Sequence, residues 1–358
     1  MFIRLQLLQK KSSKTLNSTL KLLKFIGSPF APKEYPEEFQ AEEASALYLH
    51  AIKNRIPLLC LDTLEKMRKS SRLERTYRKE YSRYLEIFDT MAKVSAFLNS
   101  LNVEHAIFKS IRPYPDASVD IDTLIFDSEK YEKVVKSFSN TGCKLLGYGP
   151  QSTTFFDPRA KVGIDLYREI AVSWVVYLDK RKLQRYISRI QLPNKTYVST
   201  LIPQADLTAI IAHSVIKEQI YTLAEFYTFL TLLKKMKIKE VEDLAELIKK
   251  NNLIAAAKSF VSTTLVLHKE AFGFVPAKLE ILLSRLGRDG LEEKRLTQNG
   301  FHTPHRYHFL TLIKSLITKI KEEKTRKSLA LQGFEMTKPN FAKTVLAGLA
   351  DHMIRETY

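Results

Sequence analysis

Cysteine is scarce in this chain: Cys60 and Cys143 are the only two among 358 residues, and they lie far apart. Two distant cysteines provide neither the ligand spacing of a zinc site nor a disulfide framework, so a reducing, cytoplasmic environment is expected. Long apolar runs are missing too. The best candidate, residues 253–267, is interrupted by Lys258 and Ser259, whereas a membrane-spanning helix needs roughly 18 apolar residues. We therefore expect no transmembrane segment.

Acidic residues are also in short supply. The chain has 39 Asp and Glu against 57 Lys and Arg, which gives a formal net charge of +18 at pH 7. A partner rich in phosphates is the first explanation for this surplus, since each neutralised phosphate releases counterions. Solubility, or adaptation to the interior of the host, is the alternative. The hydrophobic content of 45% is that of a globular protein and excludes a wholly disordered chain.

The N-terminus concentrates positive charge. Its basic residues, all before the first acid at Glu34, are Arg4, Lys10, Lys11, Lys14, Lys21, Lys24 and Lys33. The leucines between them fit a targeting peptide, a membrane-surface helix or a basic arm for RNA. A cationic flap on the folded body is the interpretation that we prefer.

Patterns along the chain indicate three regions. Residues 1–79 combine the basic arm with helical periodicity, residues 80–200 contain most of the strand-like segments, and residues 201–358 have helical periodicity almost throughout. The predicted fold class is α+β, with a small mixed-sheet nucleotide-handling domain flanked by N-terminal and C-terminal helical regions. Predicted strands cover residues 105–108, 119–125, 143–146, 153–156 and 162–167. Predicted helices cover residues 38–64, 80–101, a segment capped by Ser128 and ended by Gly142, and 206–232, 241–249, 253–267 and 309–320.

The predicted strand at residues 119–125 places two carboxylates, Asp120 and Asp122, in an otherwise apolar, β-branched run. The two-residue period of a strand puts both acids on one face and the valine and isoleucines on the other. Adjacent anions raise each other's proton affinity unless a cation lies between them. Carboxylate oxygens suit Mg²⁺ or Mn²⁺ together with substrate phosphates, so this strand is a candidate site for phosphoryl or nucleotidyl transfer. An edge strand kept soluble by charge is the plainer interpretation.

A third carboxylate, Asp165, lies in the segment 162–167, where Gly163 leaves space beside it. Three carboxylates on neighbouring strands can hold two metal ions about 3.5–4 Å apart, one at the nucleophile and one at the leaving phosphates. Upstream, Lys109 and Ser110 follow the first predicted strand. A cation, a hydroxyl and turn amides at that place can grip the oxygens of a triphosphate.

This ordered set of residues resembles the polymerase-β-type nucleotidyltransferase superfamily. Members of that superfamily have a Gly-Ser turn, an Asp-x-Asp strand shortly after it, and a third acid on a later strand. The corresponding residues are Lys109-Ser110, Asp120, Asp122 and Asp165. The resemblance spans roughly residues 80–233 and includes the apolar helical segment that follows the strands.

Within the superfamily, the chain is most similar to the uncharacterised nucleotidyltransferase family with a Leu-Lys-Gly turn. In that family a Tyr-Pro pair precedes the Asp-x-Asp strand, and Tyr114-Pro115 stand there in this chain. The sequence departs from the pattern at three places. Lys109 replaces the glycine before the serine, Tyr167 stands where relatives often have His, and Arg112 is the nearest arginine to the acidic pair.

The resemblance implies a metal-dependent enzyme that moves an NMP from an NTP to an acceptor, either RNA (such as a tRNA) or a protein. Asp120 and Asp122 would bind Mg²⁺ or Mn²⁺ and the NTP phosphates. Asp165 would hold the catalytic metal and assist deprotonation of the acceptor hydroxyl. The predicted nucleotide-binding residues are Lys109, Ser110 and Arg112. Tyr167 is interpreted as a wall of the site, and His213 as a packed core histidine.

A basic tract follows the third acid closely. Its members, predicted as nucleic-acid contacts, are Lys180, Arg181, Lys182 and Arg185. A solvated helix face is the alternative. Two other functions stay open for the chain as a whole. One is a catalytically lapsed nucleotidyltransferase fold that binds RNA or acts as a toxin–antitoxin partner protein, and the other is a membrane-surface protein anchored by its basic N-terminus.

Overall fold

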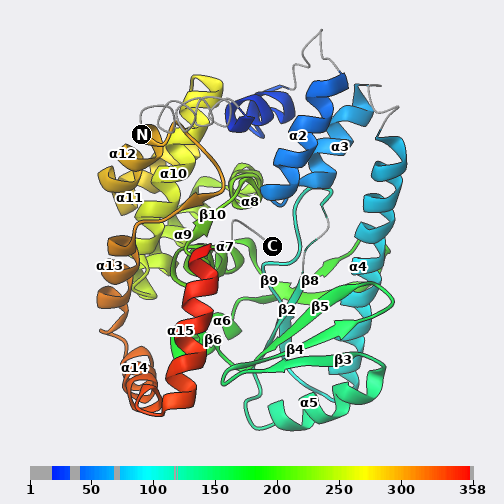
Figure 1. Cartoon of the computed structure of the whole chain (residues 1–358), viewed down its shortest axis with the longest axis vertical. Helices are drawn as coiled ribbons and strands as arrows, with labels where there is room; N and C mark the ends of the chain where they lie inside the picture. Colours follow the sequence, from blue (N-terminus) through cyan, green and yellow to red (C-terminus); the bar gives the residue numbers. More distant parts are fainter. Residues whose placement is uncertain (1–17, 33–40, 68–72, 117, 119, 355–358) are drawn as a thin grey trace, which may run out of the picture.

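A seven-stranded mixed sheet lies beside a large helical region, and the helices from the N-terminal part of the chain lie next to both (Figure 1). The computed structural model describes residues 18–32, 41–67, 73–116, 118 and 120–354. The chain is a mixed α/β protein with helical flanks, as the sequence predicts. Residues 1–17 and Lys33 of the predicted basic arm lie outside the described residues, whereas residues 18–26 form a helix with Leu22 and Leu23 buried.

The strand order of the sheet is β3-β4-β5-β2-β1-β9-β8. Its strands are β1 (His105–Ile107), β2 (Asp120–Ile125), β3 (Lys144–Tyr148), β4 (Ser152–Asp157), β5 (Val162–Tyr167), β8 (Ile187–Gln191) and β9 (Tyr197–Leu201). The pairs β2–β5 and β1–β9 are parallel, and the others are antiparallel. Two small antiparallel sheets pair β6 (Ile170–Val172) with β7 (Val175–Leu178), and β10 (Ile220–Tyr221) with β11 (His305–Arg306).

One face of the sheet is covered by two helices, α4 (Glu74–Ser100) and α5 (Tyr131–Phe138). The alternation of β2 directs Ile121 and Ile125 into this core, as predicted, and Ile164 of β5 joins them. Val119, which was predicted to join them, lies outside the described residues. Each fully buried aliphatic side chain contributes roughly 1.5–3 kcal/mol, so this core fixes the register that positions the opposite face.

The opposite face packs against the helical region. Leu124 of β2 and Tyr167 of β5 belong to a second core, which they share with α7 and α8. Because side chains alternate along a strand, Asp120, Asp122 and Asp165 point to this second face. The three acids therefore lie between the sheet and the helices.

The helical region contains one predicted helix that is wrong. Residues 206–232 do not form a single helix, because α7 ends at Ala212, a π-helix follows, and β10 intervenes before α8. The elements of this region are α7 (Pro203–Ala212), η2 (His213–Glu218), α8 (Leu223–Lys235), α9 (Ile238–Lys250), α10 (Ile254–Phe272), α11 (Ala277–Leu286), α12 (Gly290–Gln298), α13 (Phe309–Lys319), α14 (Glu323–Met336) and α15 (Pro339–Ile354). Predicted helices at 241–249, 253–267 and 309–320 are confirmed as α9, α10 and α13.

Smaller differences concern the ends of elements. The predicted cap Ser128 is wrong, since α5 begins at Tyr131 with Lys130 at the N-cap and no side-chain cap. The predicted helix at 38–64 is divided into two. The remaining short elements are α2 (Ala41–Lys53), α3 (Pro57–Lys66), η1 (Ser139–Thr141) and α6 (Arg181–Gln184). The predicted limits of the three regions, after residues 79 and 200, stay predictions.

Candidate functional site

The register of β2 against β5 brings three aspartates together. Asp122 lies directly opposite Asp165, and Asp120 lies opposite Gly163. One oxygen of each of the three carboxylates lies within 4.8 Å of those of the other two. A Cβ added at Gly163 would meet the Cβ of Asp120 at 3.6 Å, which is an ordinary contact. Gly163 therefore keeps space open beside the acids rather than avoiding a clash.

Burial and mutual repulsion shift the proton affinities of this cluster. Burial raises the pKa of Asp120 to about 7, and the charges of Asp122 and Asp165 act in the same direction. Burial and the charge of Asp122 also raise the pKa of Asp165, against a 2.5 Å hydrogen bond from the Thr154 hydroxyl. Burial would raise the pKa of Asp122 as well, but the Lys109 ammonium holds it below its ordinary value. Such a cluster favours a bound cation, since a cation relieves the repulsion that protons otherwise relieve.

Lys109 turns the chain directly after β1. Its φ of 62° is left-handed, which is uncommon outside glycine. The backbone N–H donates to Asp206 Oδ1 of α7 at 2.7 Å, which ties the turn to the helical region. The Nζ atom lies 3.1 Å from Asp122 Oδ1 and 3.1 Å from His213 Nδ1. With its side chain only 8% exposed, Lys109 is a buried counter-ion of Asp122.

Ser110 lies beneath the cluster and is engaged inside the turn. Its buried Oγ accepts a hydrogen bond from the Asp122 N–H at 2.8 Å and lies 3.2 Å from the Phe108 carbonyl, to which it donates. Its N–H donates to the same carbonyl at 2.8 Å. The backbone donors of both Lys109 and Ser110 are therefore already used within the protein.

The π-helix η2 supplies one wall of the site. Single π-helical turns are frequent at functional sites. Burial and the Lys109 ammonium lower the pKa of His213 to about 4, so its imidazole is neutral. Nε2 then donates to Glu218 Oε1 at 3.3 Å, and Nδ1 accepts from Lys109. Glu218 also lies 4.0 Å from Arg55 Nη2, in the turn between α2 and α3. His213 is packed among polar groups and lines the cavity as well.

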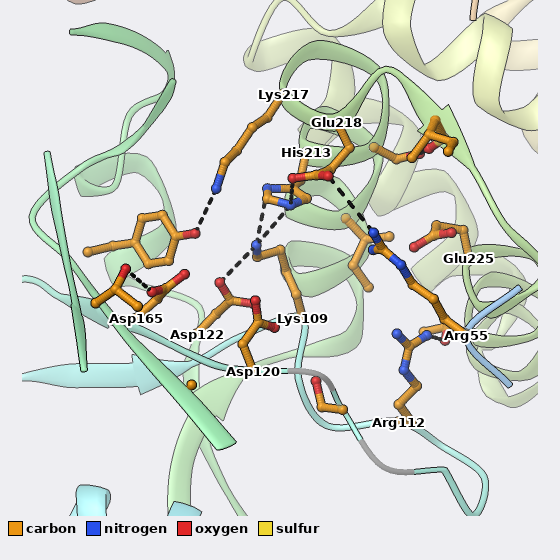
Figure 2. A pocket seen from close by; sticks show the side chains of 18 of the residues that line it. Arg55, Lys109, Arg112, Asp120, Asp122, Asp165, His213, Lys217, Glu218 and Glu225 are labelled. Atoms are coloured by element: carbon orange, nitrogen blue, oxygen red, sulfur yellow. Dashed lines mark hydrogen bonds and ion pairs between the residues drawn. The ribbon is translucent and has the colours of Figure 1, made fainter. Parts of the chain in front are cut away.

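Lys217 reaches the acids from the same π-helix. Its Nζ donates to the Tyr167 hydroxyl at 3.0 Å and lies 5.3 Å from the centre of that ring. Lys109 Nζ lies 5.4 Å from the same centre. In Figure 2, Lys217 approaches on the side of Asp165, and Lys109 lies between Asp122 and His213. Tyr167 is thus a buried wall of the site, as predicted, and two ammonium groups lie near its ring.

Arg112 contacts α8 and its own link between β1 and β2, and not the three aspartates of the cluster. Its Nη1 donates to the Tyr114 hydroxyl at 3.3 Å and to Thr228 Oγ1 at 3.2 Å. Its Nε lies 3.9 Å from Asp116 Oδ2. The arginine lines the cavity, but these contacts anchor the link between β1 and β2 to the helical region.

The acids and cations face one cavity of about 500 Å³ between the sheet and the helical region (Figure 2). This volume lies within the range of small-molecule sites. Anionic groups, the three aspartates, line one part of it. Cationic groups from distant segments line another part, namely Arg55, Lys109, Arg112 and Lys217, and two further carboxylates, Glu218 and Glu225, also face the cavity. A ligand that carries phosphates and a divalent cation matches this distribution of charge.

The predicted nucleic-acid contacts do not line this cavity. Lys180, Arg181 and Lys182 line a second hollow beside α14, and Arg185 follows them in the sequence. Lys180 is only 2% exposed, and its Nζ donates to the Ile125 carbonyl at 2.7 Å, so its ammonium is engaged inside the protein. Arg181 pairs with Asp179 at 3.0 Å, and Lys182 with Glu322 at 3.3 Å. Arg185 stacks on Tyr186. Contact of the exposed members with nucleic acid stays a prediction.

The structure thus gathers Asp120, Asp122, Asp165, Lys109 and Arg112 around one cavity, with Ser110 beneath it. Sequence reasoning missed the cavity residues Arg55, Lys217 and Glu218, and Asp206, which holds the turn. A signal for two of them exists: Lys217 and Glu218 interrupt an otherwise apolar segment just after His213. Charges placed within a buried helical run point to a break in the helix or to a site.

Comparison with known proteins adds no assignment. No family of known proteins matches the chain in a search of family models, and no curated protein matches it either. Within the described residues, no helix combines the length and the apolar character that crossing a membrane requires.

Proposed function

We propose that the chain is a metal-dependent nucleotidyltransferase of the polymerase-β type, which transfers an NMP from an NTP to a hydroxyl group of an RNA, such as a tRNA, or of a protein. One observation carries the proposal. Asp120, Asp122 and Asp165 present oxygens within 4.8 Å of one another, at a cavity that also receives the ammonium groups of Lys109 and Lys217. Carboxylates for metal ions and cations for phosphates are the two sets of groups that this chemistry needs.

The donor set fits a hard divalent cation. All three ligands are carboxylates from rigid neighbouring strands, and oxygen ligands of this kind suit Mg²⁺ or Mn²⁺. Asp120, Asp122 and Asp165 would hold the ion. When bound, it would neutralise charge on the phosphates and increase the acidity of the acceptor hydroxyl.

The reaction joins the acceptor oxygen to the α-phosphorus of the NTP and breaks the bond between that phosphorus and the bridging oxygen. The electron pair of the broken bond leaves with pyrophosphate, and the hydroxyl proton passes to Asp165. Asp165 is a carboxylate that faces the cavity, where it can accept a proton from a bound hydroxyl group. Lys109 balances negative charge beside Asp122. The rate gain would come from positioning and charge neutralisation.

A second candidate is a catalytically lapsed nucleotidyltransferase fold that binds RNA or a partner protein. The contacts of Lys109 favour it. The ammonium lies 3.1 Å from Asp122, where it competes with a metal ion for the carboxylate, and the N–H groups of the turn already have acceptors within the protein. This candidate predicts salt-sensitive RNA binding that is indifferent to divalent cations and to loss of the aspartates.

Labelled NTPs test the proposal directly. The protein is incubated with each α-labelled NTP, Mg²⁺ or Mn²⁺, and either total RNA or total protein, and digestion of the product with ribonuclease or protease identifies the acceptor. Wild type is expected to incorporate label. The double variant Asp120→Asn plus Asp122→Asn is expected to lose it by about two orders of magnitude or more.

The matched control is Asp243→Asn, which removes a surface carboxylate of α9 and is expected to leave incorporation unchanged. Equal incorporation by wild type and the double variant would make the proposed site wrong. No incorporation by any form, together with salt-sensitive and metal-independent RNA binding, would establish the lapsed alternative.

A further inference from the structure

The triphosphate of an NTP needs cationic or N–H donors beyond the aspartates, because its charge must be neutralised while it is held. The turn after β1 cannot supply backbone donors in this structure. Lys109 N–H donates to Asp206 and Ser110 N–H donates to Phe108. The donors for the phosphates must therefore come from side chains that face the cavity.

Most cations of the cavity are held by anions. Lys109 pairs with Asp122 at 3.1 Å, Arg55 lies 4.0 Å from Glu218, and Arg112 lies 3.9 Å from Asp116. Withdrawing Arg55 or Arg112 toward a ligand weakens the pairing of a buried carboxylate, which is unfavourable, and Lys109 leaves Asp122 without cost only where a metal ion takes its place.

Lys217 differs from these three cations. Its recorded partner is the neutral Tyr167 hydroxyl at 3.0 Å, and among the described residues no carboxylate forms an ion pair with it. The ammonium has three donors, and the phenol oxygen takes one. Turning the others toward an anion leaves no carboxylate unpaired. Burial raises the pKa of Tyr167 well above its ordinary value, so the phenol stays neutral beside the ammonium.

The place of Lys217 also fits a phosphate ligand. It lies on the Asp165 side of the cavity (Figure 2), and it lines that cavity together with Asp120, Asp122 and Asp165. An ammonium that shares one cavity of about 500 Å³ with the three acids can contact the phosphates of a ligand whose metal ion they hold.

We propose that Lys217 binds the β- and γ-phosphates of the NTP, and so the pyrophosphate that leaves, and that Tyr167 is a positioning residue that holds the ammonium in place through its hydroxyl. This inference rests on the proposed function, since it names the group that grips the triphosphate in that reaction. The triphosphate is then bound by a side chain of the π-helix η2 and not by the backbone of the turn after β1.

Inorganic tripolyphosphate tests the inference without turnover. Isothermal titration in the presence of Mg²⁺ compares wild type with Lys217→Met and Lys217→Gln, both of which remove the charge and keep most of the stem. Binding is expected to weaken by about 10- to 100-fold in both variants, as for the loss of a hydrogen bond to a charged group. Tyr167→Phe is expected to weaken it less, by about 2- to 10-fold. Lys93→Met, at an exposed position of α4, is the control and is expected to bind as wild type.

The outcomes separate this inference from the proposed function. Equal tripolyphosphate affinity in wild type, Lys217→Met and Lys217→Gln overturns the inference, whatever the result of the incorporation assay. Incorporation of NMP by wild type with an unchanged KM for NTP in both variants also overturns it and leaves the proposed function intact. Affinity that depends on Lys217, in a protein that transfers no NMP, supports the phosphate site and overturns the proposed function.

Discussion

Among single residues, Asp120 reports most directly on the state of the acid cluster. Burial raises its pKa to about 7 from the ordinary value of 3.8, and the charges of Asp122 and Asp165 contribute in the same direction. Between these two pH values, the folded protein keeps a proton that the unfolded chain has released. The stability that this group contributes is therefore fully present below the unfolded pKa and is lost as the pH rises through the folded pKa.

We expect this proton to appear in the pH dependence of stability when EDTA removes divalent cations. The free energy of unfolding of wild type should fall more steeply between about pH 4 and about pH 7 than that of Asp120→Asn, because asparagine binds no proton. The difference accumulated over this range should be a few kcal/mol at most. Urea denaturation followed by circular dichroism at a series of pH values measures it.

Asp243→Asn again serves as the control, and its curve should run parallel to that of wild type. Addition of Mn²⁺ should stabilise wild type more at pH 7 than at pH 5, since the ion and the proton compete for the same carboxylates. Parallel curves for wild type and Asp120→Asn would mean that Asp120 is not held in its protonated form by burial.

Among the secondary-structure elements, η2 decides which side chains face the acids. Its last residue is followed by Gln219 in a left-handed conformation, with φ 52°, which ends the π-helix and directs the chain into β10. The N–H of Gln219 donates to the Ser214 carbonyl, and its own carbonyl accepts from the Tyr307 N–H at 3.0 Å. The backbone at this position, rather than the side chain, makes the contacts, so the effect of a substitution should follow its tolerance of positive φ.

Two substitutions at Gln219 should therefore differ in their effect on stability. Gln219→Val should lower the free energy of unfolding by about 1–2 kcal/mol, because the left-handed backbone already brings the glutamine Cβ close to the carbonyl oxygen and β-branching increases this crowding. Gln219→Gly should change it by less than about 1 kcal/mol, since glycine adopts this conformation freely. Thermal or urea unfolding of the two variants compares them side by side. Equal destabilisation by both would show that the side chain, not the conformation, matters.

The elements also show what the sequence can reveal and why. β2 and β5 are predictable because each alternates buried aliphatic residues with the acids or glycine on the site face, and the pair brings Asp122 opposite Asp165. The break at η2 has only a weak local signal, the charges of Lys217 and Glu218, because most of residues 206–232 fit the apolar pattern of one helix and β10 pairs with β11 far along the chain. Local periodicity cannot report a pairing that depends on a distant partner.

At the scale of the whole molecule, the cavity is built where three distant segments meet. The turn after β1 supplies Lys109, the link between α2 and α3 supplies Arg55, and η2 supplies Lys217 and Glu218. The acids were predictable from their own strands. Lys109 and Arg112 were predictable as well, because they lie in the link between two predicted strands. Arg55 and Lys217 were not, because their approach depends on how the helical region packs against the sheet in the shared core.

Asn54 joins the N-terminal helices to the rest of the molecule. Its fully buried side chain donates to the carbonyls of His50 at 3.1 Å and Thr303 at 3.3 Å, and it accepts from the Leu223 N–H at the start of α8 at 3.2 Å. It immediately precedes Arg55. The side-chain amide of Asn54 therefore fixes this turn against the first residues of α8, and the turn brings Arg55 to Glu218.

Asn54→Ala should for this reason destabilise the molecule strongly, although alanine fits the space. The Leu223 N–H and the Thr303 carbonyl lose this buried partner, whereas the His50 carbonyl keeps the N–H of residue 54. Each unsatisfied group costs roughly 1–3 kcal/mol, so we expect the free energy of unfolding to fall by about 2–5 kcal/mol. Urea denaturation measures the loss. Asn340→Ala, at an exposed position near the start of α15, should change stability by less than about 0.5 kcal/mol. Similar denaturation midpoints for the two variants would contradict the docking of the α2–α3 turn onto α8, and with it the placement of Arg55 at the cavity.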